Sequence, residues 1–260
     1  MALFITFEGG EGCGKTTQAE ILKNSLRRQK KWGVLNIAEP GTTLFGKRIR
    51  EWLKHKDRPL MIIPGSGTQL DLFEKENGHD GLPIIKINID SPREELLAFT
   101  LARSQLVEEV IIPNLTGKNI IICNRFADST MAYQGYGRGL DLELVKVANR
   151  IATQGIKPDL TILLDIPPEI GLARKFGDDR NKFEKEEFDF HKRVRGGYLK
   201  LAAAEPDRWF VLDALRPVNE IQEAIWTKVR RLITTKETES KLIQSDSELS
   251  ATVIQSQTCA

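Results

Sequence analysis

The chain has 260 residues, 40% of them hydrophobic, which is enough for one sizeable α/β domain with short appendages. Its 38 Lys and Arg residues nearly balance its 36 Asp and Glu residues. This balance argues against a general nucleic-acid or membrane-surface binder, because both classes carry a basic excess. No apolar run is long enough to cross a bilayer, and the three cysteines show neither metal-site spacing nor a disulfide framework. We therefore expect no signal peptide, no membrane partner and a reducing, cytoplasmic location.

The first predicted element is an apolar strand, Leu3–Phe7, which leads through a glycine-rich loop into a predicted helix, Lys15–Lys31. The loop reads GGEGCGKT and fits the pattern G-x-x-x-x-G-K-T. In this order of strand, loop and helix, backbone N–H groups surround a phosphate chain and Lys15 reaches the β- and γ-phosphates. The hydroxyl of Thr16 is then a ligand for Mg²⁺. The pattern predicts a nucleoside-triphosphate site.

Short β-branched runs alternate with longer helical stretches up to about residue 235. The further predicted strands are Val34–Ala38, Asn119–Cys123, Leu160–Asp165 and Trp209–Leu212. The further predicted helices are Thr43–Lys54, Arg93–Leu115, Leu140–Thr153, Glu184–Ala204 and Val218–Ile233. This alternation predicts a three-layer α/β/α fold with a parallel sheet, whose ligands bind at the carboxyl ends of the strands.

Two segments do not fit the alternation. The connection His55–Ser91 is rich in Pro and Gly, so we expect a surface excursion, with a hairpin that pairs Leu60–Ile63 with Ile84–Ile89. The segment Lys236–Ala260 is polar and lacks aromatic residues, so we expect a disordered tail. The predicted organisation is one domain at 1–235 with an insertion at about 55–91, followed by a tail at 236–260.

Polar residues follow two of the predicted strands. The second strand ends in Glu39-Pro40-Gly41-Thr42, and Arg50 lies on the next helix; taken alone, this pattern favours a plain turn beside a solvated arginine. The third strand ends in Asn124-Arg125 and continues as a Gly-rich segment to Gly139. Glycine loses more conformational entropy on folding than other residues, and it is favoured where the backbone lies close to a ligand. This segment therefore predicts contact with a ligand.

Two further groups of residues can be interpreted either as functional or as purely structural. Phe99 and Arg103 are four residues apart and share a helix face, which suits recognition of a planar base but also a core residue beside a surface one. The segment Arg174–Lys192 is dense in charge, as expected for solvated helices or for a mobile lid whose cations neutralise a transferring phosphoryl group.

Taken together, these motifs resemble the bacterial thymidylate kinase family. The matching strings are FEGGEGCGKTTQ, EPGTT followed by GKRIR, LLAFTLARSQL, NRFADSTMAYQGYGRGLD, PDLTILLD and FDFHKRVRGGYLKLA. The resemblance runs from about Leu3 to about Ile233. It implies a P-loop fold with a five-stranded parallel sheet, a homodimer, and transfer of the γ-phosphoryl group of ATP to dTMP with Mg²⁺. The products would be dTDP and ADP, in the route to dTTP.

The resemblance also implies the members of each site. The ATP site would comprise Gly9, Gly10, Glu11, Gly12, Cys13, Gly14, Lys15, Thr16, Thr17 and Arg174, with Thr16 on Mg²⁺. The dTMP site would comprise Glu39, Arg50, Phe99, Arg103, Arg125, Ser129, Thr130, Tyr133 and Gln134. The catalytic set would be Lys15, Arg125, Arg180, Lys182 and Glu11.

Individual roles follow from the same resemblance. Arg50 and Arg125 would clamp the dTMP phosphate, and Glu11 would lie near that phosphate and the 3′-hydroxyl. Phe99 would stack on thymine and Arg103 would bond its O4. Thr130 would face the base edge, and Tyr133 would exclude a ribonucleotide. Because Gly12 stands where some members carry an Arg, the lid would supply the catalytic cation through Arg180, assisted by Lys182.

The chain departs from the family pattern in several places. Asn124 replaces an Asp that helps to organise Mg²⁺, Lys182 replaces a lid Arg, and Ala38 replaces an Arg before Glu-Pro-Gly. The 55–91 connection is also longer than usual. Two alternatives to a dTMP kinase therefore stay open: a low-activity nucleotide-binding paralogue, and a kinase for another nucleoside monophosphate.

Overall fold

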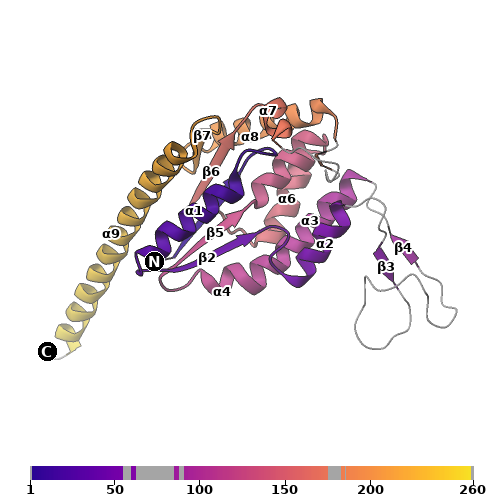
Figure 1. Ribbon diagram of the computed structural model, residues 1–260. Helices are drawn as coiled ribbons and strands as arrows, with labels where there is room; N and C mark the ends of the chain where they lie inside the picture. The colour runs from indigo at the N-terminus through magenta and orange to yellow at the C-terminus, as the bar shows by residue number, and fades with distance from the viewer. Residues whose placement is uncertain are drawn as a thin grey trace.

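The computed structural model describes residues 2–54, 60–62, 85–87, 91–174, 183–184 and 186–258. Figure 1 shows a central sheet with helices on both of its faces, and a long C-terminal helix that extends beyond the body of the molecule. Within the described part of the chain, no helix combines the length and the apolarity that a membrane crossing requires.

The central sheet has five parallel strands in the order β2-β5-β1-β6-β7. They are β1 (Leu3–Glu8), β2 (Gly33–Ala38), β5 (Asn119–Asn124), β6 (Leu160–Asp165) and β7 (Trp209–Asp213). The predicted fold class and the five predicted strands are confirmed. In the register, Phe7 lies opposite Asn124 and Glu8 lies opposite Leu163. The carboxyl ends of β1 and β5 therefore lie side by side, and the P-loop and the Asn124-Arg125 turn leave the sheet together.

The helices connect and cover the strands. They are α1 (Lys15–Arg28), α2 (Leu44–Lys54), α3 (Pro92–Leu106), the π-helix η1 (Val107–Ile111), α4 (Ile112–Asn114), α5 (Ala127–Thr130), the π-helix η2 (Met131–Gly137), α6 (Leu142–Thr153), α7 (Pro168–Ala173), α8 (Phe188–Ala204) and α9 (Val218–Thr258). A capping box starts helix α3. Ser91 Oγ accepts from the Glu94 N–H, and the Glu94 carboxylate accepts from the Ser91 N–H.

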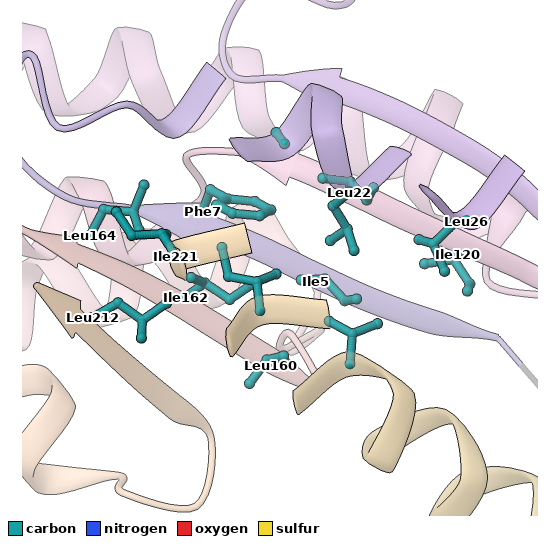
Figure 2. Packing of buried hydrophobic residues seen from close by; sticks show 14 of the residues in the cluster. Ile5, Phe7, Leu22, Leu26, Ile120, Leu160, Ile162, Leu164, Leu212 and Ile221 are labelled. Carbon is teal, nitrogen blue, oxygen red and sulfur yellow. The ribbon is translucent and has the colours of Figure 1, made fainter. Parts of the chain in front are cut away.

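Strand β1 is buried along its whole length, because helices pack on both faces of the sheet. On one face, Ile5 and Phe7 pack with Leu22 of α1 and Ile221 of α9, as Figure 2 shows. On the other face, Phe4 packs in a second cluster with residues of β5, α3 and η1. A strand held on both sides is a rigid support, which fixes where the loop after β1 begins.

Within the domain, three predicted segments differ from the structure. The predicted helix Arg93–Leu115 is divided among α3, η1 and α4. The Gly-rich segment after Arg125, for which we predicted no regular element, is helical in α5 and η2. The predicted helix Glu184–Ala204 begins only at Phe188.

The 55–91 connection contains the predicted hairpin. Strands β3 (Leu60–Ile62) and β4 (Ile85–Ile87) pair antiparallel, with Leu60 opposite Ile87 and Ile62 opposite Ile85. The other residues of the connection between 55 and 90 lie outside the described part of the chain.

The tail was expected to be disordered, but α9 continues through it to Thr258. No Gly or Pro interrupts residues 218–258, so nothing in the sequence ends the helix early. The first turn of the tail is also tied to the body of the molecule. Lys236 forms an ion pair with Asp159 at 2.8 Å, and Glu237 forms one with Lys31 at 2.8 Å.

Candidate active site

The P-loop leaves β1 and turns back on itself before α1. Gly12 and Gly14 have φ of +68° and +90°, in the left-handed region that side chains disfavour. At Gly12 there is also no room for a side chain, because a Cβ atom would lie 1.9 Å from the Gly171 carbonyl oxygen of α7. Glycine at this position is therefore required both by the backbone conformation and by the close approach of α7.

Lys15 folds back onto the loop that precedes it. Its ammonium donates to the carbonyl oxygens of Gly9 and Gly10 at 3.1 and 2.7 Å and lies 3.2 Å from Cys13 Sγ. At the start of α1, Gly14 offers no side-chain cap. The first N–H groups of the helix and a lysine held only by neutral groups therefore face the same space, which is the arrangement of an anion site.

This space is a cavity of about 540 Å³, here called the P-loop cavity. Its lining residues are Glu11, Gly12, Cys13, Gly14, Lys15, Thr16, Thr17, Ala38, Glu39, Arg50, Asn124, Arg125 and Arg174. The predicted ATP-site residues from Glu11 to Thr17 are among them. Arg174 joins them from the end of α7, where its guanidinium donates to the carbonyl oxygens of Gly12 and Ala214 at 3.4 Å. Gly9 and Gly10 are not among the lining residues, and their carbonyl oxygens accept hydrogen bonds from Lys15.

A second cavity, here called the Phe99 cavity, has a volume of about 150 Å³. Its lining residues are Glu11, Glu39, Pro40, Arg50, Leu53, Phe99, Arg103, Arg125, Ser129, Thr130, Tyr133, Gln134 and Phe183. All the residues that we predicted for a dTMP site line this one cavity, although they come from four separate parts of the chain.

The two cavities meet at four charged residues, since Glu11, Glu39, Arg50 and Arg125 line both. Arg50 has no hydrogen-bond or ion-pair partner among the described residues, and it is exposed. A ligand in the P-loop cavity and a ligand in the Phe99 cavity would therefore approach each other over two guanidinium groups.

Arg125 is the most heavily bonded of these four residues. Its backbone is left-handed, with φ of +69°, a conformation uncommon for a residue with a side chain. Its Nη2 donates to Glu11 Oε1 at 2.7 Å and to the Tyr133 hydroxyl at 3.0 Å. The Tyr133 hydroxyl in turn donates to Glu11 at 2.8 Å. The Nη1 of Arg125 donates to the Gly9 carbonyl at 3.1 Å, which links the guanidinium to the P-loop.

Arg103 is fully buried and bonded to Glu39. Its Nε donates to Glu39 Oε2 at 2.9 Å, and its Nη2 donates to the other carboxylate oxygen. Nη2 also donates to Thr130 Oγ1 at 2.6 Å, and Nη1 donates to Asn149 Oδ1 at 2.6 Å. Burial raises the pKa of Glu39, although the charge of Arg103 opposes this effect. The guanidinium plane is thus fixed at the wall of the Phe99 cavity, and Nη1 keeps one N–H that has no acceptor in the described part of the chain.

Asn124 lies at the end of β5, next to the P-loop. Its amide Nδ2 donates to the hydroxyl of Thr16 at 3.0 Å. An aspartate at the same place would accept a hydrogen bond from Thr16 instead, so the substitution reverses the direction of this contact.

The two predicted lid cations, Arg180 and Lys182, lie outside the described residues. The next residue, Phe183, is described and lines the Phe99 cavity, with its ring 6.0 Å from that of Phe99 and 6.1 Å from that of Tyr133. A residue from the middle of the predicted lid segment Arg174–Lys192 therefore reaches the site.

Sequence reasoning missed several groups that shape the site. Glu95 is one of them, because its Oε1 accepts one N–H of the Gln134 side-chain amide at 2.7 Å. Glu95 also pairs with Arg138 at 3.1 Å, and Arg138 pairs with Glu186 at 2.7 Å. Glu8, directly before the P-loop, is completely buried beside Arg125. The signal for Glu8 was a charged residue that ends an otherwise apolar strand.

Comparisons with known proteins agree with this geometry. The family model described as Thymidylate kinase matches residues 7–62 and 84–225, which leaves 63–83 unmatched within the predicted insertion. A thymidylate kinase of Synechococcus sp. is 42% identical over 227 residues, which cover 87% of this chain and 94% of that protein. One of Dehalococcoides mccartyi is 42% identical over 233 residues, 90% of this chain and 98% of that protein.

A solved structure shows the same fold. The crystal structure of thymidylate kinase from Ehrlichia chaffeensis superposes with a TM-score of 0.57 at 29% identity and covers 81% of this chain and 92% of that one. The family model matches well over half of the chain, and the curated relatives match along nearly their whole length. The chain therefore belongs to the thymidylate kinase family.

Proposed function

We propose that this chain phosphorylates dTMP to dTDP, with ATP bound in the P-loop cavity and dTMP bound in the Phe99 cavity. The observation that carries the proposal is the junction of the two cavities at Glu11, Glu39, Arg50 and Arg125. A donor site and an acceptor site that share their charged groups suit a transfer between two bound phosphates. The family membership reported above supports the same reaction.

In phosphoryl transfer, the protein acts mainly by positioning the two substrates and stabilising charge, and little through covalent chemistry of its own. Lys15 is held by two carbonyl oxygens, and turning from them toward a phosphate exchanges neutral acceptors for an anion. Arg50 and Arg125 stand where the acceptor phosphate would meet the γ-phosphate. Their fixed cations would stabilise the charge that develops between the two groups.

Base recognition is assigned to Phe99 and Arg103. Phe99 contributes an aromatic ring to the cavity wall, and its neighbours Phe183 and Tyr133 form the adjacent walls. Arg103 keeps one N–H on Nη1, and its plane is fixed by Glu39 and Asn149. A carbonyl oxygen of a pyrimidine is a suitable acceptor for that donor.

The residues of the P-loop cavity could hold Mg²⁺ together with the ATP phosphates, without several acidic protein ligands. Among the described residues there is no group of His, Cys, Asp and Glu that could hold a metal ion by itself. Mg²⁺ in phosphoryl-transfer sites usually keeps waters and binds substrate phosphates, so few protein ligands are needed. Thr16 lines the P-loop cavity and would be a direct ligand, with Asn124 beside it. The ion would supply neutralisation of the ATP phosphates.

A coupled assay of ADP release tests the proposal. The chain should turn over dTMP and discriminate against dGMP, dAMP, dCMP and UMP. Arg103→Ala should raise the KM for dTMP far more than the KM for ATP, but it also leaves Glu39 buried without its partner. Phe99→Leu is a second variant that keeps apolar volume and removes the stacking face. Equal or better turnover of another monophosphate by the intact enzyme would refute the acceptor assignment.

A catalytically weak nucleotide-binding paralogue remains a second candidate, and Asn124 is the observation that favours it. Binding of ATP and dTMP without turnover at saturating Mg²⁺, together with turnover by Asn124→Asp, would select this alternative. We expect the intact chain to be active.

We further propose that the chain acts as a homodimer in the cytoplasm. Helices α3 and α6 pack together and leave large apolar side chains exposed, namely Leu97, Leu101, Leu144, Val147 and Ile151. Large apolar side chains that are exposed on two packed helices are expected to be covered. Light scattering should give twice the mass of one chain, and Ile151→Glu should give a monomer. The buried thiols of Cys13 and Cys123 suit a reducing compartment.

A further inference from the structure

Glu8 has no role in the account given so far, yet it is completely buried one residue before the P-loop. Its Oε1 accepts from the Phe126 N–H at 2.8 Å. Its Oε2 accepts from the Ser129 hydroxyl at 2.5 Å and from the Tyr198 hydroxyl at 2.9 Å. Ionised carboxylates are costly to bury unless donors surround them, and here three donors do so.

The two hydroxyls that donate to Glu8 also accept from Arg125. Its Nη1 donates to Ser129 Oγ at 3.2 Å and to the Tyr198 hydroxyl at 3.1 Å. A guanidinium has no acceptor, so both hydroxyl oxygens must turn lone pairs, and not protons, toward it. The two hydroxyl oxygens are themselves only 2.8 Å apart.

Counting protons shows what keeps the hydroxyls in this orientation. Glu8 Oε2, Ser129 Oγ and the Tyr198 oxygen form a triangle. When Glu8 is ionised, the triangle holds only the two hydroxyl protons, and both can lie inside it. An amidated Glu8 that keeps its oxygen on the Phe126 N–H brings two N–H protons to the triangle, so four protons share three edges. One hydroxyl proton then has to turn outward, where it meets an N–H of Arg125. A protonated Glu8 adds one proton, which the third edge can hold, but it removes the negative charge that strengthens both hydroxyl contacts.

We propose that Glu8 is a positioning residue for Arg125: as a carboxylate it turns the Ser129 and Tyr198 hydroxyls so that they hold the guanidinium toward the acceptor phosphate. The inference rests on the role proposed above for Arg125. Since Tyr198 lies on α8 and Ser129 on α5, the arrangement also ties the end of β1 to two separate helices. Lys15 and Arg125 both donate to the Gly9 carbonyl, so the same group connects the donor and acceptor sites.

The surroundings of Glu8 set the pH at which it is ionised. The charged or titratable groups that face it are Asp128 on α5, Cys123 on β5, Arg125 and Tyr198. Burial, with a further contribution from the charge of Asp128, raises the pKa of Glu8 to about 7, although the Ser129 hydrogen bond and Arg125 oppose this rise. The positioning state is therefore favoured above neutral pH and weakens below it.

The test uses the full chain with ATP, Mg²⁺ and dTMP. Glu8→Gln should lower kcat/KM for dTMP on the order of tenfold or more, the size expected when a hydrogen bond to a charged group is lost. The KM for ATP should stay within about twofold, a margin smaller than the loss of one such bond produces. Tyr198→Phe keeps the ring and should show the same pattern more weakly, so the inference remains testable if Glu8→Gln does not fold. Tyr136→Phe is the matched control, because its hydroxyl makes no hydrogen bond among the described residues.

A double-mutant cycle separates positioning from a general structural role. With both hydroxyls removed, in Ser129→Ala/Tyr198→Phe, adding Glu8→Gln should cost little further activity, because no hydroxyl proton remains to be turned. In the wild type, kcat/KM for dTMP should fall as the pH drops through about 7. The part of this fall that belongs to Glu8 should be missing in Glu8→Gln, whereas the fall caused by protonation of the substrate phosphates, whose second pKa is about 6, should stay in both proteins.

Three results would overturn the inference: Glu8→Gln within twofold of the wild type, the same fold-loss in both backgrounds, or a pH limb unchanged by the substitution. None of these would affect the proposed function. That function fails separately, if the wild-type chain does not turn over dTMP.

Discussion

The burial of Glu8 predicts that this residue lowers the stability of the fold as the pH rises. Its pKa in the folded protein is about 7, against an ordinary value of 4.5. Between these values the folded chain binds a proton that the unfolded chain has released. The stabilising contribution of the protonated group is therefore complete below pH 4.5 and is lost as the pH rises through about 7.

The magnitude follows from the two pKa values. One pKa unit corresponds to about 1.4 kcal/mol, so the free energy of unfolding should fall by roughly 3 kcal/mol between pH 4.5 and pH 8 on account of Glu8 alone. For a domain of this size that equals a loss of about 6–12 °C in Tm. Glu8→Gln cannot titrate, so it lacks this term and serves as the reference at every pH.

Urea unfolding of the ligand-free wild type and of Glu8→Gln, at equal protein concentration across pH 4.5–8, measures the difference directly. Other carboxyl groups titrate in the same range, but their contributions cancel when the two proteins are subtracted. The wild type should lose stability relative to the variant as the pH rises. A difference that is constant with pH, or that changes in the opposite direction, would show that Glu8 does not titrate as its surroundings imply.

Three other variants probe the site. Asn124→Asp should lower the Mg²⁺ concentration for half-maximal rate, because a carboxylate accepts from Thr16 and adds a charge near the metal; an unchanged Mg²⁺ dependence would contradict this. Arg180→Ala should lower kcat by orders of magnitude with little change in KM, since a lid cation would act mainly in the transition state; an unchanged kcat would leave Lys182 as the candidate. Arg138→Met should raise the KM for dTMP several-fold, the loss expected for one or two partly buried ion pairs, because Arg138 pairs with Glu95 and Glu186 and lies 5.9 Å from the ring of Phe183. A surface control, Arg216→Met, should leave that KM unchanged.

Much of the fold could be predicted from the sequence because local signals agreed with one another. The apolar strands of the parallel sheet read as continuous β-branched runs, and the P-loop carries its own pattern of glycines. The carboxyl ends of adjacent parallel strands share one edge, so the residues after β1 and β5 had to meet. Phe99 and Arg103 reach the same cavity because their helix spacing puts them on one face.

The rest depended on tertiary contacts that leave no local signal. Nothing in the sequence around Glu95 predicts that it holds both Gln134 and Arg138, since these pairs join residues about forty positions apart. Glu8 looks like the end of a strand until the fold brings Tyr198 to it from 190 positions away. Conversely, the tail at 236–260 was expected to be disordered on composition. It contains no helix breaker and continues a helix that is already formed, so α9 extends through it to Thr258.

The charges at the junction of the two cavities are the reason to expect a contribution from the predicted lid after Arg174. Of the four shared residues, Glu39 is neutralised by the buried Arg103 and Glu11 is bonded to Arg125, so these pairs add little net positive charge. Lys15, Arg50 and Arg174 are the cations of the P-loop cavity without a carboxylate partner among the described residues. Two nucleotides bring more negative charge than these three cations offset, even with one Mg²⁺. We expect further positive charge from the predicted lid, whose residues 175–182 include Lys175, Arg180 and Lys182 beside Asp178 and Asp179. Phe183 lines the acceptor cavity, and Arg180 and Lys182 precede it by no more than three positions in the sequence.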